Sequence, residues 1–407
     1  MSFERYIAQR FMPRKNAEGG FAGPLSQVAV ASIALGVMVM VMSVCILRGF
    51  QSEITNKAVG FGSHITIHSY ELVGAYQEEP VAIDSGLVAR ISAVDGVRHV
   101  QFFATKGGMV KTNEQIHGIL FRGLSRGYDS SFFRSNLVEG HLPDLDRGTS
   151  NEVLISSTIA AKLRLHVGDK MRTYFWQNDS YRSRAFTVAG IYSTDLNEFD
   201  EKYVVGDLRQ VQRLNNWDSL QVGGYEVLVD NFGQLDNTAR AIREELPYDI
   251  TLTTVTLANP ALFSWLDLLN SNITLILAIM CVVSAIAIIS ALLIMIFEKS
   301  STIGVLKALG ANNASVRKIF IIKASRLIAA GIVIGDALAL LLCIIQSRWH
   351  VVQLDPESYS MSHVPIDLNP WIFIGVSIGT AAVCMAALLL PAAYISRINP
   401  AVTVKID

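Results

Sequence analysis

Four long stretches of the chain consist almost entirely of apolar residues. Three of them, residues 28–47, 268–297 and 368–396, contain no Asp, Glu, Lys or Arg. Each is long enough to cross a hydrocarbon core of roughly 30 Å as a helix. The fourth stretch, residues 327–347, has one charged residue, Asp336, near its middle. Because an intramembrane carboxyl is tolerated where it faces protein or water, we interpret this stretch as a span too.

The residues between the first two spans are enough for one sizeable globular domain or two small ones. Their pattern alternates between strand and helix at both ends. The predicted strand–helix–strand segments are 64–68, 85–94 and 97–105 at the start, and 225–229, 233–245 and 250–255 at the end. They predict a split β-α-β subdomain made of residues 50–124 and 222–260, interrupted by an inserted subdomain at 125–221.

The inserted segment is predicted to be mainly β. Residues 152–156 indicate a strand, and residues 157–165 a helix that follows it. Residues 171–176 are expected to pair with residues 185–192 across a connection at 177–184, where Asn178-Asp179-Ser180 has the side chains that favour turns.

The predicted fold is therefore a polytopic α-helical membrane protein. It has four transmembrane helices and a large extracytoplasmic α+β domain inserted between helices 1 and 2. The expected segments are a cytoplasmic amphipathic N-terminal segment (1–27), transmembrane helices (28–49, 268–297, 319–347 and 370–391), the external domain (50–267), a cytoplasmic coupling helix (298–318), an outer loop (348–369) and a cytoplasmic C-terminus (392–407).

The orientation follows from Lys and Arg in the short flanks of the spans, because these residues accumulate on the cytoplasmic side. Basic residues precede span one (Arg5, Arg10, Arg14, Lys15), lie between spans two and three (Lys299, Lys307, Arg317, Lys318, Lys323, Arg326) and follow span four (Arg397, Lys405). The loop after span three carries Arg348 against Asp355, Glu357 and Asp367. Both termini are therefore predicted inside and the large domain outside. Span one is expected to be an uncleaved anchor, since its basic lead and apolar run are both long for a signal peptide.

Composition and motifs argue against several function classes. The net charge of −1 gives no basic surface for nucleic acid. All four cysteines fall inside the spans, so the external domain is expected to fold without disulfides. The chain has no P-loop motif, and its one G-x-S-x-G match, residues 375–379, lies in span four instead of a strand–turn–helix. We therefore predict no catalytic site and no metal site. Gly375 and Gly379 are expected to pack against another helix, as are Gly331, Gly335 and Gly36.

A short amphipathic helix is predicted where span two ends, at residues 298–311. Ile303, Leu306 and Leu309 lie on one side, and Glu298, Lys299 and Lys307 surround them. Gly310 is expected to end the helix. We expect this coupling segment to dock into a cleft of a cytoplasmic ATPase. The alternative is a helix that rests on the lipid surface.

Helical spacing also places several residues on shared faces inside the spans. Gly36, Met40, Ser43 and Leu47 share a face of span one, and Ile273, Leu277 and Met280 share a face of the outer half of span two. The residues alone favour ligand binding and plain helix packing about equally. For Asp336, we expect a hydrogen bond to Ser or Thr on a neighbouring helix, and the alternative is a proton-linked or gating group.

Four segments together resemble one family. They are residues 34–37 through 48–50, residues 298–311, Val364-Pro365-Ile366, and residues 391–401. The chain resembles the four-span permeases of the FtsX/MacB type, and most closely the lipoprotein-releasing (Lol C/E) permease subunits. Two positions depart from that pattern. Thr302 stands where an acidic residue is frequent, and the connection at 177–184 is short for the hook that captures a periplasmic carrier.

The resemblance implies a non-catalytic permease subunit of a type VII (mechanotransmission) ABC transporter in the bacterial inner membrane. Such a subunit pairs with a second permease as a homodimer or heterodimer. It binds a separate ATPase, which holds ATP and Mg, so no cofactor is expected in this chain. It lifts lipoproteins from membrane lipid for a periplasmic carrier. Acyl chains enter between spans one and two, which assigns substrate binding to the two faces named above. The alternatives are an FtsX-like regulator of cell-wall hydrolysis and a MacB-like efflux permease subunit.

Overall fold

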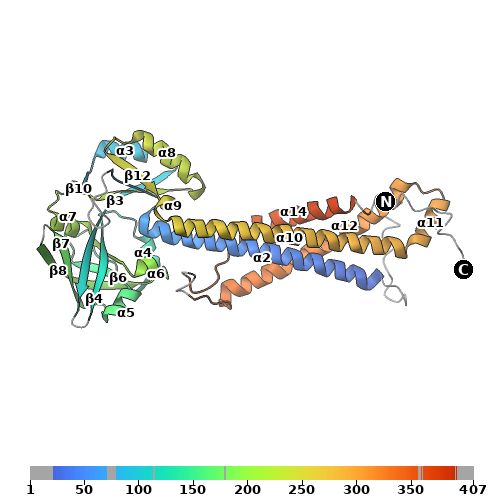
Figure 1. Ribbon diagram of the computed structural model, residues 1–407, viewed down its shortest axis with the longest axis horizontal. Helices are drawn as coiled ribbons and strands as arrows, with labels where there is room; N and C mark the ends of the chain where they lie inside the picture. Colours follow the sequence, from blue (N-terminus) through green and yellow to red (C-terminus); the bar gives the residue numbers. More distant parts are fainter. Residues whose placement is uncertain are drawn as a thin grey trace. The chain divides into compact units, whose positions relative to one another are not determined.

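The computed structural model describes residues 22–70, 79–112, 115–177, 180–355, 359, 361–389 and 391, without the side chains of residues 22–26, 301 and 308 (Figure 1). Most of the predicted N-terminal segment and the whole segment 392–407 lie outside these ranges. So do the basic residues Arg5, Arg10, Arg14, Lys15, Arg397 and Lys405, and the predicted turn residues Asn178 and Asp179.

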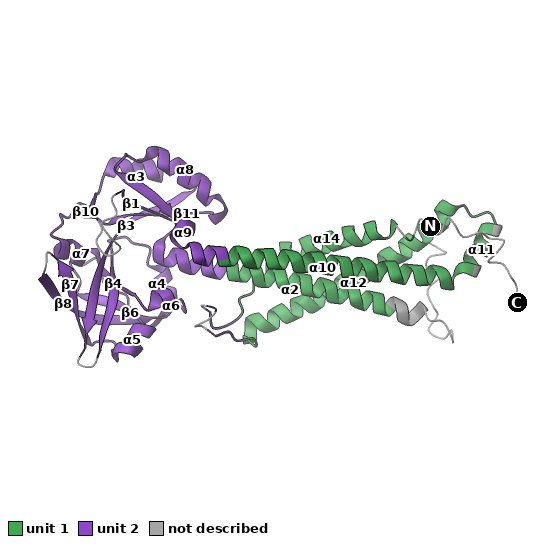
Figure 2. Cartoon of the chain, in the orientation of Figure 1, with its two compact units in different colours: residues 1–51, 265–352, 364–407 green, residues 52–264, 353–363 purple. Residues whose placement is uncertain are grey.

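The chain divides into two compact units (Figure 2). Unit 1 comprises residues 1–51, 265–352 and 364–407, and unit 2 comprises residues 52–264 and 353–363. Unit 1 is helical in its described residues, whereas unit 2 is built around a sheet. In chain order, the sheet residues stand between the first and second long apolar helices.

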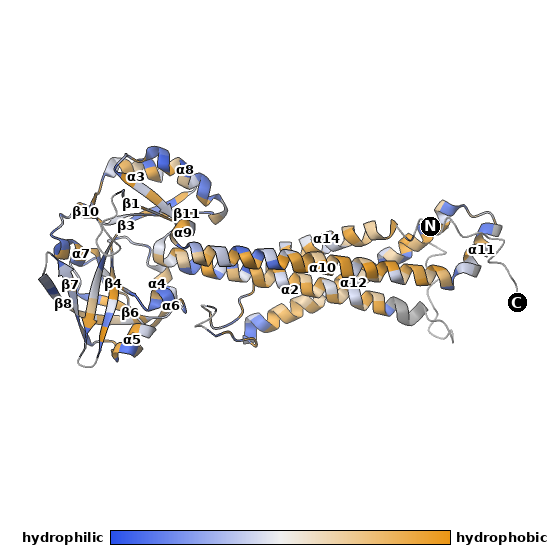
Figure 3. Ribbon diagram, viewed as in Figure 1, coloured by the Kyte–Doolittle hydropathy of each residue, from blue (hydrophilic) through white to orange (hydrophobic). Residues whose placement is uncertain are grey.

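Four described helices are long and apolar enough to cross a membrane. They are α2 (Ala22–Gly62), α10 (Pro260–Glu298), α12 (Asn313–Trp349) and α14 (Pro370–Ala387), and a shorter helix, α11 (Ser300–Ala308), follows α10. The ribbons of the four long helices are mainly apolar in Figure 3. Helices α2, α10 and α12 each contain one of the apolar stretches seen in the sequence, and α14 lies within the stretch 368–396. The predicted coupling helix at 298–318 is divided, because α11 ends at Ala308 and the last residues already belong to α12.

Side-chain caps explain where two of these helices begin. The Asn312 side chain accepts a hydrogen bond from the Ser315 amide at 2.7 Å, at the start of α12. The Asn369 side chain likewise accepts one from the Trp371 amide at 3.1 Å, with Pro370 at the first helical position of α14. Asn caps satisfy amides that have no partner within the helix, and proline lacks such an amide.

Small residues let the helices of unit 1 approach closely. A Cβ atom on Gly335 would lie 2.6 Å from the Ala34 carbonyl oxygen, and one on Gly331 would lie 2.8 Å from the Ile33 Cβ, both on α2. The packing predicted for Gly331, Gly335 and Gly36 is confirmed. For Gly375 and Gly379 the packing stays a prediction, because an added Cβ would meet no described atom within 4 Å. Their face of α14 is therefore directed away from the described part of the chain.

The described residues of unit 2 form a ten-stranded mixed sheet. Its strands are β1 (Ile65–Ser69), β3 (Val97–Lys111), β4 (Ile116–Leu124), β5 (Leu137–Gly140), β6 (Glu152–Ser156), β7 (Lys170–Gln177), β8 (Ser180–Tyr192), β9 (Tyr203–Asp207), β11 (Gly224–Val229) and β12 (Ile250–Thr254). The order is β12-β1-β11-β3-β4-β9-β6-β8-β5, and β7 pairs with β3 and β8. The pairs β4–β9 and β6–β8 are parallel. Two short strands, β2 (Val81–Ala82) and β10 (Gln221–Val222), pair separately.

Helices flank this sheet. Two of them, α3 (Ser85–Ser92) and α8 (Leu235–Glu245), confirm the helices predicted in the two β-α-β segments. The others are α4 (Ser131–Ser135), α5 (Ser157–Leu163), α6 (Asn197–Asp200), α7 (Leu208–Asn215), α9 (Val255–Ala258) and a 3₁₀ turn, η1 (Phe232–Gln234). Buried Leu87 and Ile91 of α3 and Ile242 of α8 pack into one hydrophobic cluster with β1, β11 and β12.

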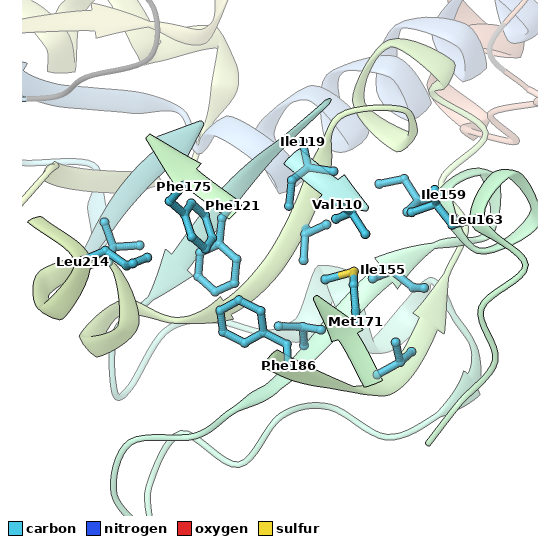
Figure 4. Close-up of a cluster of buried hydrophobic side chains, with 14 of the residues drawn as sticks. Val110, Ile119, Phe121, Ile155, Ile159, Leu163, Met171, Phe175, Phe186 and Leu214 are labelled. Carbon is cyan, nitrogen blue, oxygen red and sulfur yellow. The ribbon is translucent and has the colours of Figure 1, made fainter. Parts of the chain in front are cut away.

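A second cluster fills the space around β3, β4, β6 to β9, α5 and α7 (Figure 4). Phe121, Phe175 and Phe186 are fully buried at its centre, with the Phe121 and Phe186 ring centroids 5.0 Å apart. The second cluster includes Ala104, Val110, Ile119 and Phe121 from the expected split subdomain, so the clusters do not follow the expected division at residue 125. Strand β3 runs through both, because Val97 and Val100 pack in the first cluster and Ala104 and Val110 in the second.

The β7–β8 hairpin differs from the expected connection at 177–184. The strands stay paired from Lys170↔Thr187 to Gln177↔Ser180, so residues 180–184 belong to β8. A cross-strand aromatic contact stabilises this extension, with the Trp176 and Tyr181 ring centroids 4.8 Å apart. The polar composition of residues 180–184 predicts a loop, but these residues form a strand whose outer face is exposed.

A buried polar network joins three neighbouring strands. Arg122 of β4 forms an ion pair with Glu226 of β11, and both side chains are almost fully buried. Between them on β3, Gln101 donates to Glu226 Oε2 at 2.9 Å and accepts a hydrogen bond from the Asp129 amide at 3.0 Å. The Arg122 guanidinium also lies 4.9 Å from the Phe103 ring centroid. Pairing of this kind is what permits a charge to be buried.

Candidate functional site

The predicted coupling segment contains α11 and the turn that follows it. Ile303, expected on the outward apolar face, is 1% exposed and packs in the cluster of unit 1 that also contains Val316 and Phe320 of α12. Leu306 is half-buried. The exposed apolar residues are Val305, at 45%, and Leu309, at 80%. The outward face of α11 is thus rotated relative to the one expected from spacing alone, since α12 covers the Ile303 side.

Gly310 ends this segment as the sequence predicts. Its φ of +93° is a left-handed conformation that glycine adopts without strain. The Gly310 amide donates to the Lys307 carbonyl oxygen, and the Ala311 amide donates to the Leu306 carbonyl oxygen, both at 3.0 Å. This pair of hydrogen bonds is a Schellman motif. It reverses the chain into α12 and leaves Leu309 exposed at the corner.

Two charged residues of the coupling segment, Glu298 and Lys299, lie at the junction of α10 and α11. Lys299 Nζ lies 3.9 Å from Glu298 Oε1, which is a weak surface contact. Lys307 is half-buried in the last turn of α11, and Thr302 is exposed. The exposed surface therefore combines Thr302, Val305 and Leu309 with basic side chains beside them.

The two predicted substrate faces meet within the chain. A Cβ atom on Gly36 would lie 2.7 Å from the Ser284 Oγ of α10, and the Met40 Sδ lies 3.8 Å from the Cys281 Sγ. Met40 is 1% exposed, and Leu277 and Met280 pack against the same cluster. The structure thus brings Gly36 and Met40 together with Leu277 and Met280. Gly36 and Met40 are buried, and Leu277 and Met280 are partly buried.

The remaining residues of these two faces are placed differently. Leu47 is 6% exposed, whereas Ser43 and Ile273 are half-buried. A separate, exposed apolar face of α10 carries Leu268, Leu275, Ile279, Val282, Val283 and Ile286. The sequence interpretation did not single out this face, because uniformly apolar helices give little periodicity from which to choose one.

Asp336 of α12 has the kind of partner that the sequence predicts. The Ser377 Oγ of α14 donates a hydrogen bond to Asp336 Oδ2 at 2.6 Å. Ser377 is the central residue of the G-x-S-x-G match. Its hydroxyl is therefore engaged with a carboxyl group from a neighbouring helix, and its setting is a helix interior.

The two histidines four residues apart have separate partners. His64 Nδ1 accepts a hydrogen bond from the Val229 amide at 3.3 Å, and burial together with nearby Arg98 lowers the pKa of His64 to about 4. The His68 ring contacts the Ser69 carbonyl oxygen at 2.9 Å and the Thr253 hydroxyl at 3.0 Å. Among the described residues, no group of three or more His, Cys, Asp or Glu side chains is placed to hold a metal ion.

Comparison with solved structures gives weak global similarity to external domains of transporters. Relatives are the extracellular domain of the noncanonic ABC-type transporter YknZ from Gram-positive bacteria (15% identity, TM-score 0.32, 47% of this chain and 99% of that chain) and the periplasmic region of MacB from Actinobacillus actinomycetemcomitans (12% identity, TM-score 0.35, 50% of this chain and 94% of that chain).

Comparison with curated proteins covers nearly the whole chain. The lipoprotein-releasing system transmembrane protein LolC of Xylella fastidiosa is 22% identical over 98% of this chain and 98% of that protein. The lipoprotein-releasing system transmembrane protein LolE of Haemophilus influenzae is 21% identical over 97% of each.

Two families divide the chain between them. Residues 26–245 match the family described as the MacB-like periplasmic core domain, and residues 252–400 match the FtsX-like permease C-terminal family. The first match alone covers more than half of the chain, and the boundary between the two falls near β12, just before α10. The resemblance seen in the sequence is confirmed, and the chain belongs to the family of permeases that join a MacB-like periplasmic core domain to an FtsX-like C-terminal region.

Proposed function

We propose that this chain is the permease subunit of a lipoprotein-releasing ABC transporter of the inner membrane. The observation that carries the proposal is the match to LolC and LolE proteins along essentially the entire length of both chains. The matching region includes the four apolar helices and unit 2 together, as a whole permease requires. Neither a regulator of cell-wall hydrolysis nor an efflux permease has comparable support.

In this proposal the chain does no chemistry of its own. A separate ATPase subunit binds ATP and Mg, and a second permease subunit, identical or paralogous, completes the membrane part. The outward face of α11, with Val305 and Leu309, is the surface offered to the ATPase. Exposed apolar side chains on a short helix between two membrane helices are suited to insertion into a cleft of a partner protein.

The substrate is a lipoprotein whose acyl chains leave membrane lipid along α2 and α10. Gly36, Met40, Leu277 and Met280 supply a flexible apolar contact between these helices, and methionine adapts to chains of variable shape. Because α2 and α10 pack directly against each other at these residues, an acyl chain can enter only if the two helices separate. Alternatively, the acyl chain binds between this pair of helices and the partner permease. A soluble periplasmic carrier then receives the lipoprotein from the side of unit 2.

Co-purification from detergent tests this function. The full chain, solubilised from its own membranes, is expected to retain an ATPase and a lipid-modified protein that leaves on addition of ATP and Mg. A photo-crosslinking residue in place of Leu277 is expected to capture the lipid-modified protein. Recovery of a wall hydrolase instead, with no lipoprotein before or after ATP, would support the regulator and exclude lipoprotein release.

A further inference from the structure

One exposed surface of unit 2 changes from aromatic to cationic within a few residues. It is formed by four neighbouring strands, β4, β3, β7 and β8 (Figure 1). On β7 the side chains of Met171, Thr173 and Phe175 are buried, which leaves the alternate residues on the outer face. Along that face the order is Lys170, Arg172, Tyr174 and Trp176.

The aromatic half of this surface is hollowed. The hollow has a volume of about 650 Å³, which is in the range of small-molecule sites. Its lining includes Met109, Leu120, Tyr174, Trp176 and Tyr181. Glycines on β3 and β4, such as Gly107 and Gly118, keep its floor low. Met109, Trp176 and Tyr181 are 38%, 48% and 58% exposed. Tyrosine and tryptophan have an apolar body and a polar tip, which suits them to the boundary between an acyl chain and its headgroup.

The cationic half is a second hollow, of about 590 Å³, directly along the same strands. Its lining includes Lys111, Lys162, Arg164, Lys170 and Arg172. Lys162 is already engaged, since it donates to Glu201 Oε1 at 2.9 Å. Within the described ranges, Lys111, Lys170 and Arg172 have no carboxylate within the 4.0 Å limit of an ion pair, and no Asp or Glu lines either hollow. Glu114 and Asp179 lie outside those ranges.

Strand register places residues that line the two hollows on the same face of neighbouring strands. Met109 of β3 pairs with Tyr174 of β7 in the aromatic half. Lys111 of β3 and Arg172 of β7 lie two residues away along their strands, on the same face, in the cationic half. A ligand with an anionic head and an apolar chain can therefore contact both halves without crossing an edge of the sheet.

We propose that this surface, residues 107–111, 116–120, 170–176 and 181–185, binds an anionic phospholipid. The phosphate contacts Lys111, Lys170 and Arg172, for which it is a preferred partner, and one acyl chain lies over Met109, Tyr174 and Trp176. Two hollows of small-molecule size favour a lipid over the broad, flatter face that a folded protein covers. Lipid binding at this surface goes beyond lipoprotein release and does not depend on it.

Site-specific photo-crosslinking tests the proposal in the full chain. The protein, with p-benzoylphenylalanine in place of Met109, is reconstituted in nanodiscs of phosphatidylcholine and exposed to water-soluble dioctanoyl phosphatidylglycerol. Irradiation is expected to attach this lipid at position 109. Dioctanoyl phosphatidylcholine at equal concentration is expected to attach about tenfold less, because its choline cation offsets the phosphate charge beside these cationic side chains. Equal capture of the two lipids, or capture of neither, would overturn the proposal.

Two substitutions and one salt titration test whether Lys170 and Arg172 bind the phosphate. Lys170→Gln together with Arg172→Gln is expected to lower capture of phosphatidylglycerol about tenfold, to the level of phosphatidylcholine. The matched control, Arg240→Gln with Arg243→Gln, removes the same charge from α8 and is expected to leave capture unchanged. Capture by the otherwise unsubstituted protein is expected to fall as salt rises, which tests the charge without any change of fold.

Insensitivity to both the Lys170/Arg172 change and salt contradicts the proposal. Irradiation in native membranes that captures a protein at position 109, with no lipid, assigns the surface to a protein partner instead.

Discussion

The Ser377 hydroxyl of α14 donates a hydrogen bond of 2.6 Å to the Asp336 carboxyl group of α12, between two of the four candidate membrane spans. This contact gives a partner to the one acidic residue within the apolar stretches. It also gives Ser377, the central residue of the G-x-S-x-G match, a structural role within a helix. A polar pair of this kind stabilises helix contact inside a bilayer, where an unpaired group is costly.

Asp336→Asn is expected to leave lipoprotein release nearly unchanged, because the amide oxygen still accepts the hydrogen bond from Ser377. Asp336→Leu is expected to lower the melting temperature in detergent, since it leaves the Ser377 hydroxyl without this acceptor, at a cost of about 1–3 kcal/mol. Release is measured in proteoliposomes that contain the ATPase and the partner permease. Normal assembly combined with a strong loss of release in the Asn variant would contradict this structural role and support a gating role.

Leu309→Glu is expected to abolish co-purification of the ATPase while the melting temperature of the isolated permease stays within about 1 °C, since an exposed residue has little effect on folding. Leu309 is 80% exposed at the turn after α11, so a charge there disturbs a partner and not the fold. Leu257→Glu is the matched control, because Leu257 is 68% exposed in unit 2. Retention of the ATPase by the Leu309 variant would exclude this surface from coupling.

The same segment shows how far a sequence can predict such a site. Spacing correctly identified a short amphipathic helix with Gly310 at its end, because capping is a local property of the backbone. It did not determine which apolar side faces outward. That depends on the chain reversal at Gly310, which places α12 against Ile303 and exposes Leu309. Burial by a neighbouring helix depends on the tertiary structure, so the spacing of three apolar residues cannot predict which of them is buried.

Unit 2 gives a parallel case. The strands and helices of both β-α-β segments were predictable from alternation, but the length of the β7–β8 hairpin was not. Residues 180–184 are polar and resemble a loop, yet they pair along β7 because Tyr181 contacts Trp176 across the strands. The amphiphilic surface was missed for the same reason. It combines residues of four strands that meet only through the sheet order.

Arg122→Met is expected to destabilise unit 2 by about 3–5 kcal/mol, because it leaves the Glu226 carboxylate buried without its cation. Both side chains are almost fully buried, so water cannot replace the lost partner. The double change Arg122→Met with Glu226→Leu is expected to recover much of that loss, since it removes both charges. Thermal unfolding of the full chain in detergent measures this cycle. A double variant no more stable than Arg122→Met would show that the pair does not act as a unit.

The last prediction concerns the pH dependence of unit 2 through His64. Burial and Arg98 lower the pKa of His64 from 6.5 to about 4, so the folded chain holds this ring neutral where the unfolded chain would protonate it. The unfolded state therefore binds more protons between these two pKa values, and stability contributed by neutral His64 is present above pH 6.5 and is lost as pH falls towards 4. His64→Asn retains an acceptor for the Val229 amide but cannot be protonated in this range. Melting temperatures measured between pH 7 and pH 5 are expected to fall less in this variant than in the parent chain. Parallel curves for the two proteins would show that His64 is not the group responsible.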